Sequence, residues 1–136
     1  MHISTEFNQD IFKKITDLWV LTGIANPARC DSFEIIANTL KMGGKMITLM
    51  DQDRLVGTVW LTNDGRRMHT HHMTIHPEYQ GKGLSKLLLE PALEFARELG
   101  LQPKLEVHES NPVARYLYKK YGFDELPDYI VMVKRS

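Results

Sequence analysis

The chain has 136 residues, 43% of them apolar, which fits one compact domain with a hydrophobic core over residues 1–136. The 17 basic and 17 acidic side chains give a formal net charge of zero, which argues against an extended nucleic-acid-binding surface or a basic membrane-binding face. The single cysteine excludes an internal disulfide, and neither a signal-like segment nor a membrane-spanning apolar run is present. We therefore expect a cytoplasmic protein with no membrane or nucleic-acid partner.

Two helices are predicted in the first third of the chain. Asn8 or Asp10 can cap a helix that runs to about Leu21, and Asp31 can cap a second helix that runs to about Met42. The side-chain oxygens of these residues accept hydrogen bonds from the first N–H groups of a helix, which have no intrahelical partner.

An antiparallel meander is predicted next, with strands at residues 46–50, 55–61 and 67–76. The turns between them are Asp51-Gln52-Asp53 and Asn63-Asp64-Gly65, and the second has the sequence of a strong hairpin turn.

The third strand ends at a proline turn and two spaced glycines, Gly81 and Gly83, which open a Leu-rich helix. Backbone N–H groups at a helix start are unpaired, and the helix dipole adds about half a positive charge there. Glycines let the backbone approach a ligand closely, and Lys82 and Lys86 add positive charge. The pattern predicts an anion site, without choosing among a nucleotide, a coenzyme and an inorganic anion.

The Leu-rich helix is expected to end at Gly100, followed by a short strand at residues 103–108. Asn111-Pro112 then begins a last helix that ends at Gly122. One or two final strands are expected from Phe123 onward. The apolar run at residues 129–133 is the candidate for such a strand and for pairing across a homodimer.

Two motifs together resemble the signature of the GNAT family of N-acetyltransferases. The first is Gln80-x-x-Gly83-x-Ser85, preceded by Met73-x-Ile75-x-Pro77, and it is similar to the family's acyl-CoA motif. The second is Asn111-x-x-Ala114-x-x-Leu117-Tyr118-x-x-x-Gly122-Phe123, which resembles the family's late helix. Ser85 stands where Gly or Ala is usual but keeps its backbone N–H. The Rossmann and Walker A patterns both fail here.

The resemblance implies an α/β (α+β) fold, with a mixed, mostly antiparallel central sheet that is flanked by helices and splays where the cofactor enters. It also implies direct transfer of acetyl from acetyl-CoA to a primary amine of a small molecule or peptide, without a covalent enzyme intermediate and without a metal. The residues it assigns to binding acetyl-CoA are Met73, Thr74, Ile75, Gln80, Gly81, Lys82, Gly83, Leu84, Ser85, Lys86, Asn111 and Tyr118.

The resemblance also places the proton donor for the leaving thiolate at Tyr118. A phenol with a pKa of about 10 can hydrogen-bond a thiol whose pKa is about 8.5. The spacing of Ala114, Leu117, Tyr118 and Tyr121 fits a core-packing stripe equally well.

Histidines on the third strand are the candidates for the general base. Strand alternation predicts that His69 and His71 share a face with Met73 and that His72 lies opposite. A histidine with a pKa of about 6.5 suits proton relay at neutral pH. In relatives a base often lies two or four residues before the position that matches Met73, which favours His71 or His69. Glu106 and His108, on one face of the next strand, are reserves.

Three other interpretations stay open. The histidines can be half-buried sheet residues, or His-x-His can supply two metal ligands, although no cysteine nearby completes a set. A noncatalytic acyl-CoA-binding sensor on the same fold is the alternative function, and its mark would be an intact cofactor motif without an acid or base.

In the GNAT family the first two helices and their connection form the wall of the acceptor site. The matching residues here are Trp19, Asn26, Pro27, Arg29 and Asp31. Arg29 can pair with a carboxylate on the acceptor, and Asp31 can receive an amine or simply cap a helix. Nothing identifies Cys30 as a nucleophile.

Overall fold

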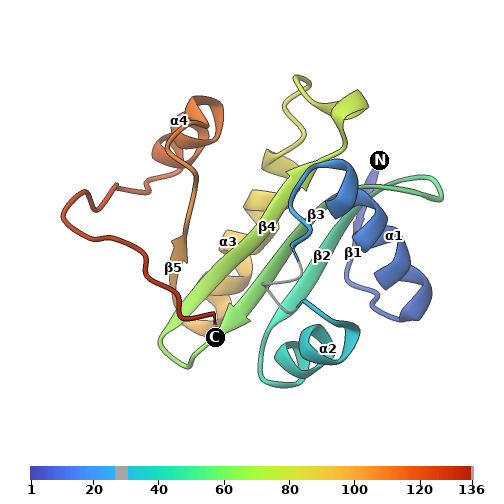
Figure 1. Ribbon diagram of the computed structural model, residues 1–136, viewed down its shortest axis with the longest axis horizontal. Helices are drawn as coiled ribbons and strands as arrows, with labels where there is room; N and C mark the ends of the chain where they lie inside the picture. Colours follow the sequence, from blue (N-terminus) through green and yellow to red (C-terminus); the bar gives the residue numbers. More distant parts are fainter. Residues whose placement is uncertain (27–30, 136) are drawn as a thin grey trace. The chain divides into compact units, whose positions relative to one another are not determined.

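The computed structural model describes residues 1–26 and 31–135, and it divides into two compact units, Met1–Leu105 and Glu106–Ser136. Figure 1 follows the chain from its N-terminus in blue to its C-terminus in red.

The first unit is built on a five-stranded sheet with the order β1-β2-β3-β4-β5. Its strands are β1 (His2–Ser4), β2 (Lys45–Asp51), β3 (Arg54–Asn63), β4 (Arg67–Ile75) and β5 (Gln102–Leu105). The neighbours from β1 to β4 are antiparallel, and β5 is parallel to β4. The predicted mixed, mostly antiparallel sheet is confirmed. The short edge strand β1 was not predicted, because three residues are too few to show an alternating pattern.

Helices cover both faces of this sheet, and Figure 1 shows α3 (Lys86–Leu99) passing behind the strands. The buried residues of the α3-side cluster are Ile47, Leu49, Val56, Val59, Leu61, Met68, Ile75, Leu88, Ala92, Ala96 and Leu101. On the opposite face, α1 (Gln9–Leu21) and α2 (Phe33–Lys41) pack on the sheet. The buried residues of that α1/α2-side cluster are Ile15, Leu18, Trp19, Ile36, Met46, Met50, Leu55 and Trp60.

The predicted cap residue is correct for the first helix and wrong for the second. The Asn8 side chain accepts a hydrogen bond from the Ile11 N–H at 2.9 Å, as predicted for the start of α1. The cap of α2 is Ser32, whose hydroxyl oxygen accepts from the Ile35 N–H at 3.2 Å. The predicted cap at Asp31 is wrong, because the Asp31 carboxylate pairs with a histidine of β4.

A β-bulge interrupts β4 and changes which way its side chains point. Thr58 of β3 pairs with Thr74, whereas Trp60 pairs with His71, so one intervening residue of β3 faces two of β4. The extra residue reverses the alternation after His71. Met73 therefore packs against the α3-side cluster, while the rings of His71 and His72 both lie near Trp60. The prediction that His71 shares a face with Met73, with His72 opposite, is wrong.

The second unit contains α4 (Pro112–Lys120), followed by Gly122 with a φ of 93°. As predicted, Asn111 caps this helix and Pro112 occupies its first turn. The predicted strands at residues 106–108 and from Phe123 onward are wrong for the described chain. Residues 129–133 are exposed and in no strand, because a strand needs a partner and the described residues of this unit contain no other strand. Their pairing across a homodimer stays a prediction.

Candidate functional site

The loop between η2 (Pro77–Tyr79) and α3 has the open backbone that the glycine pattern predicts. Gly81 has a φ of 78° and Gly83 a φ of 71°, values that L-residues with a side chain rarely adopt. A Cβ atom added at either position would meet nothing within 4 Å. The glycines are therefore required by the backbone conformation, and the space above the loop is left open.

Within the described chain, the backbone amides of this loop have few hydrogen-bond acceptors. Within the described residues, the backbone N–H groups of residues 81–86 donate to no backbone carbonyl outside regular structure. The hydrogen bonds of the helix start only with the Leu87 N–H to the Leu84 carbonyl at 3.0 Å and the Leu88 N–H to the Ser85 carbonyl at 3.1 Å. Ser85 already has helical φ and ψ, and its side chain caps nothing. These amides suit a phosphate or pyrophosphate group.

Side chains beside the loop hold it in place. The Gln80 amide nitrogen donates to the Ile75 carbonyl at 2.9 Å, so this predicted cofactor residue ties the loop to the end of β4. The Tyr79 hydroxyl donates to an Asp51 carboxylate oxygen at 2.6 Å, and this hydrogen bond is the main reason that the pKa of Tyr79 is raised. The Lys82 ammonium lies 5.4 Å from the centre of the Tyr79 ring.

β5 pairs with only the first part of β4. The register with β5 runs from Arg67 opposite Gln102 to Thr70 opposite Leu105, and β4 then continues to Ile75. The residues beyond the β5 pairing include Met73, Thr74 and Ile75, which the family resemblance assigns to the cofactor arm. The side chains of Met73 and Ile75 pack in the α3-side cluster, so backbone groups are what this stretch offers a ligand.

The two histidines predicted as bases stack on one another, with ring centres 6.3 Å apart. His71 is largely buried beside Trp60, and its Nε2 lies 2.8 Å from the Thr62 hydroxyl oxygen. Burial, and to a lesser extent His72 and His69, lowers the pKa of His71 to about 4. His71 is therefore neutral at pH 7 but binds a proton more weakly than the sequence alone predicts. His69 Nε2 lies 3.5 Å from an Asp64 carboxylate oxygen.

Sequence reasoning named His72 and Asp31 separately and missed that the two side chains pair. His72 Nε2 lies 2.7 Å from the Asp31 Oδ2, and the two side chains are only 11% and 16% exposed. The Trp19 ring meets the His72 ring edge-on, with centres 4.6 Å apart. The pair joins β4 to the segment before α2, a contact between residues far apart in the sequence. The run of histidines and the isolated aspartate were visible, but no local pattern linked them.

Two predicted site residues, Asn111 and Tyr118, belong to the second unit. The Asn111 side-chain oxygen accepts from the Ala114 N–H at 3.2 Å and so serves as the helix cap. Tyr118 is 9% exposed, and its ring meets Phe123 edge-on at 5.7 Å. Burial raises the pKa of Tyr118 to about 12, so the phenol keeps its proton at neutral pH.

The structure describes only some of the residues that were predicted to form the wall of the acceptor site. Trp19 is 2% exposed and donates its indole N–H to the buried Thr58 hydroxyl at 2.9 Å, so it is a core residue. Pro27, Arg29 and Cys30 lie outside the described residues. The predicted reserve bases Glu106 and His108 do not share a strand face, because β5 ends at Leu105.

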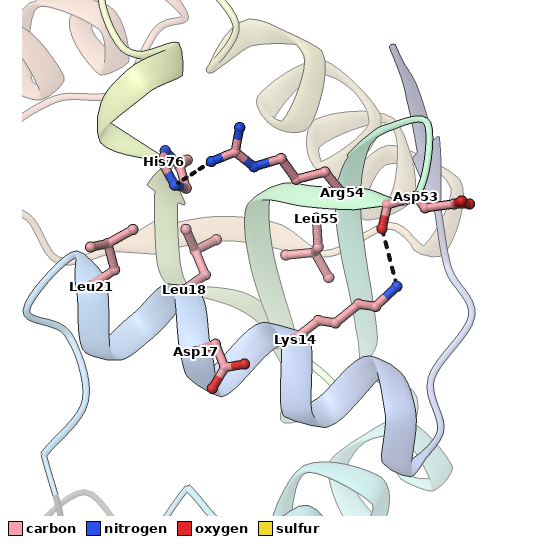
Figure 2. Close-up of a pocket in the computed structure, with 8 residues that line it drawn as sticks. All are labelled: Lys14, Asp17, Leu18, Leu21, Asp53, Arg54, Leu55 and His76. Carbon is pink, nitrogen blue, oxygen red and sulfur yellow. Dashed lines mark hydrogen bonds between the residues drawn. The ribbon is translucent and has the colours of Figure 1, made fainter.

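An open pocket of about 300 Å³ lies elsewhere in the first unit, between α1, the start of β3 and the residue after β4 (Figure 2). Lys14 donates to the Asp53 carbonyl at 3.1 Å on one side of it. On the other side, Arg54 contacts Glu78 and His76, each at 3.2 Å. The pocket contains none of the predicted site residues, and its cations already have partners.

In the described part of the chain, no three or more His, Cys, Asp or Glu side chains are grouped so that they could hold a metal ion. Within the same part of the chain, no helix combines the length and the apolar character needed to cross a membrane.

Comparison with known proteins gives consistent matches. The sequence model of the family described as Acetyltransferase (GNAT) family matches residues 12–123. A curated relative, the peptidyl-lysine N-acetyltransferase YjaB of Salmonella typhimurium, is 32% identical over 100 residues. This match covers 74% of the chain and 63% of that protein, so the chain spans less than two thirds of its relative's length.

Solved structures share the fold. An acetyltransferase from Streptococcus agalactiae superposes with a TM-score of 0.82 at 20% identity, covering 98% of this chain and 93% of that one. AAC(6')-Iy in complex with a CoA bisubstrate analogue superposes with a TM-score of 0.75 at 15% identity, covering 100% of both chains. At these identities the likeness shows the fold alone.

Proposed function

This chain belongs to the GNAT acetyltransferase family, and from that premise we propose that it transfers an acetyl group from acetyl-CoA to a primary amine. The family uses acetyl-CoA. The observation that carries the proposal is the loop at residues 81–86, whose backbone amides and two positive-φ glycines form a cradle for a pyrophosphate group. We further propose that both units belong to one catalytic domain.

The donor would be held mainly by backbone. The amides of residues 81–86, with Leu84 and Ser85 among them, bind the pyrophosphate, and Lys82 and Lys86 add positive charge. Gln80 acts indirectly, because its side chain fixes the loop to Ile75. Backbone groups of Met73 to Ile75, on the part of β4 beyond its pairing with β5, receive the pantetheine arm. The amide groups on this edge are also suited to stabilise the oxyanion that forms during acyl transfer.

The reaction needs a proton acceptor and a proton donor from this chain. Acetyl-CoA supplies an acetyl thioester, whose carbonyl carbon is attacked by the neutral amine while its C–S bond breaks. Tyr118 gives a proton to the departing sulfur, since burial keeps the phenol protonated at neutral pH. The proton that the nitrogen loses as it becomes an amide then restores the phenol. The ammonium form of the acceptor first loses a proton to a base on β4, where three histidines gather.

We propose a lysine side chain in a peptide as the first acceptor to test, ahead of small amines. The support is the 32% identical relative, which carries the name peptidyl-lysine N-acetyltransferase. A lysine ammonium has a pKa of about 10.4, so an acceptor of this kind needs a base at neutral pH.

The test combines CoA binding with amine-dependent CoA release. Calorimetry measures CoA affinity, and release is then followed across lysine peptides, free amino acids, polyamines and aminoglycosides. We expect binding together with turnover on at least one acceptor. CoA binding without turnover on any amine would favour the sensor, and absence of CoA binding would contradict both functions.

Tyr118→Phe tests the proton donor. We expect turnover to fall about 100-fold with little change in CoA affinity, because only the hydroxyl is lost. Tyr116→Phe is the matched control, since Tyr116 lies on the same helix and is 71% exposed. Equal turnover in the two variants, measured where chemistry limits the rate, would remove Tyr118 as the acid.

A further inference from the structure

A buried pair of polar side chains lies at the β4 bulge in the first unit. His72 Nε2 and Asp31 Oδ2 are 2.7 Å apart, and both side chains are more than four-fifths buried. Removing either partner would leave the other polar group buried without this hydrogen bond, which is costly. The edge-on contact with Trp19 fixes the plane of the His72 ring.

The backbone at His72 is held in a conformation that a residue with a side chain seldom adopts. Its φ is 49°, in the left-handed region, and such strain persists only when neighbours impose it. Here the neighbours are identified. The Thr58 hydroxyl donates to the His72 carbonyl at 2.8 Å and accepts from the Trp19 indole N–H at 2.9 Å. Bulges of this kind are enriched beside active sites, where they redirect a side chain.

The hydrogen bond to Asp31 determines which nitrogen of His72 can act. Because a carboxylate accepts hydrogen bonds, the neutral ring carries its proton on Nε2, and Nδ1 carries the lone pair. The carboxylate also stabilises the imidazolium that forms when Nδ1 takes a proton. Among the described residues, the titratable groups around the ring include Asp31 from the segment before α2, and His71 and, beyond it, His69 on β4 itself. From α1 and β3 the ring meets the uncharged Trp19 and Trp60.

We propose that His72 is the general base for the acceptor amine, and that Asp31 is the positioning residue that orients it. This inference rests on the proposed acetyl transfer. In the step, an N–H bond of the acceptor ammonium breaks, its proton forms a bond to His72 Nδ1, and the electron pair stays on the amine nitrogen as the nucleophile. The imidazolium later releases the proton to solvent.

His71, the base predicted from the sequence, is less suited to this step. Its Nε2 is engaged with the Thr62 hydroxyl at 2.8 Å. Among the described residues, the carboxylate nearest to this part of β4, Asp31, is hydrogen-bonded to His72. The lowered pKa of His71, about 4, makes it a weak proton acceptor at neutral pH. His71 and His72 are adjacent in sequence, so the assignment can be tested by substituting them separately.

The kinetic test measures turnover against pH for His72→Asn and Asp31→Asn. Asparagine tolerates the left-handed backbone, so His72→Asn keeps the bulge conformation. We expect His72→Asn to lower turnover about 100-fold and to abolish the rising acid limb of the profile. Asp31→Asn should move that limb to lower pH, because the imidazolium loses its stabilising carboxylate. CoA affinity should stay within threefold in both variants.

The matched controls are His2→Asn and Asp17→Asn. His2 lies on the edge strand β1, and the Asp17 side chain is 70% exposed on α1. Neither should change the profile. A merely structural role for the pair would lower thermal stability or CoA affinity without moving the acid limb, and that result would overturn the proposal. The proposal would also be overturned if His72→Asn kept the rising acid limb of the profile while His71→Gln lost it.

Nitrogen NMR of the histidine rings gives a readout that does not depend on turnover. We expect neutral His72 to be the Nε2–H tautomer, and its measured pKa to fall in Asp31→Asn. A Nδ1–H tautomer, or a pKa that is insensitive to Asp31, would contradict the assignment even if no acceptor has been found. A wild-type protein that shows the expected NMR behaviour but no acetyl transfer would instead refute the proposed function.

Discussion

The loop at residues 81–86 and the bulge at His72 both depart from regular backbone, but in opposite ways. In the loop, glycines take the positive φ values, the space above them is open, and the amides have few protein partners. At the bulge, a histidine takes the positive φ, and its ring and carbonyl are both engaged by buried neighbours. The loop therefore offers backbone to a ligand, whereas the bulge orients one side chain.

This difference fits the different tasks that we propose for the two regions. A backbone cradle recognises a charge that every molecule of the donor carries, and it depends little on neighbouring side chains. An oriented base requires a fixed ring, a defined tautomer and a supporting carboxylate, so it depends on contacts between distant segments. Substitutions should consequently affect donor binding at the loop and proton transfer at the bulge.

The largest effect is expected at Thr58, which supports the bulge. Thr58→Val leaves the Trp19 indole N–H and the His72 carbonyl without their buried partner, which should lower the free energy of unfolding by about 2–3 kcal/mol. Thr48→Val is the control, because Thr48 is equally buried but makes only a 3.4 Å bond to the Ser4 carbonyl. Chemical denaturation measures the free energy of unfolding of both variants. An equal decrease in the two would show that the Thr58 hydrogen bonds at the bulge add no more stability than the Thr48 bond.

A smaller effect is expected at the loop, where Gly83→Ala should weaken CoA binding about tenfold, or about 1.4 kcal/mol. The added methyl group occupies the space through which a pyrophosphate approaches. Gly65→Ala carries the same backbone strain, since Gly65 has a φ of 85° and also meets nothing within 4 Å. Both variants should lose about 1 kcal/mol of folding stability, but only Gly83→Ala should change the CoA affinity found by calorimetry. A matching change in Gly65→Ala would point to general destabilisation.

The smallest effect concerns His71 and pH. Because its pKa is about 4 in the folded protein and about 6.5 when unfolded, the unfolded state binds more protons between these values. The contribution of neutral His71 is therefore fully present above pH 6.5 and is lost as the pH falls toward 4. In His71→Gln, the loss of unfolding free energy between about pH 7.5 and about pH 5.7 should be smaller by about 1 kcal/mol. Parallel stability curves for the two proteins would contradict the burial of this ring.

The parts of the structure that sequence could predict are those fixed by short-range chemistry. The Asn8 and Asn111 caps, the Asn63-Asp64-Gly65 turn and the glycine loop all depend on a few adjacent residues, and all are found. The bulge could not be predicted, because a one-residue slip in strand pairing leaves no local mark and no glycine stands at His72. The predicted strand at residues 129–133 failed for a related reason, since strand formation depends on a partner as well as on composition.

The pairing of His72 with Asp31 depends on the same long-range order. The sequence placed Asp31 as a helix cap or amine ligand and His72 on the wrong face, and each prediction was reasonable from its own neighbours. Only the reversed alternation after the bulge, together with Ser32 capping α2, brings the two side chains together.

A crystal structure with bound CoA tests the central claim most directly. The account predicts that pyrophosphate oxygens accept hydrogen bonds from backbone amides of residues 81–86, and that the sulfur lies at the part of β4 beyond its pairing with β5, near the bulge. A pyrophosphate bound in the pocket of Figure 2, or any position that leaves these amides without the ligand, would contradict it.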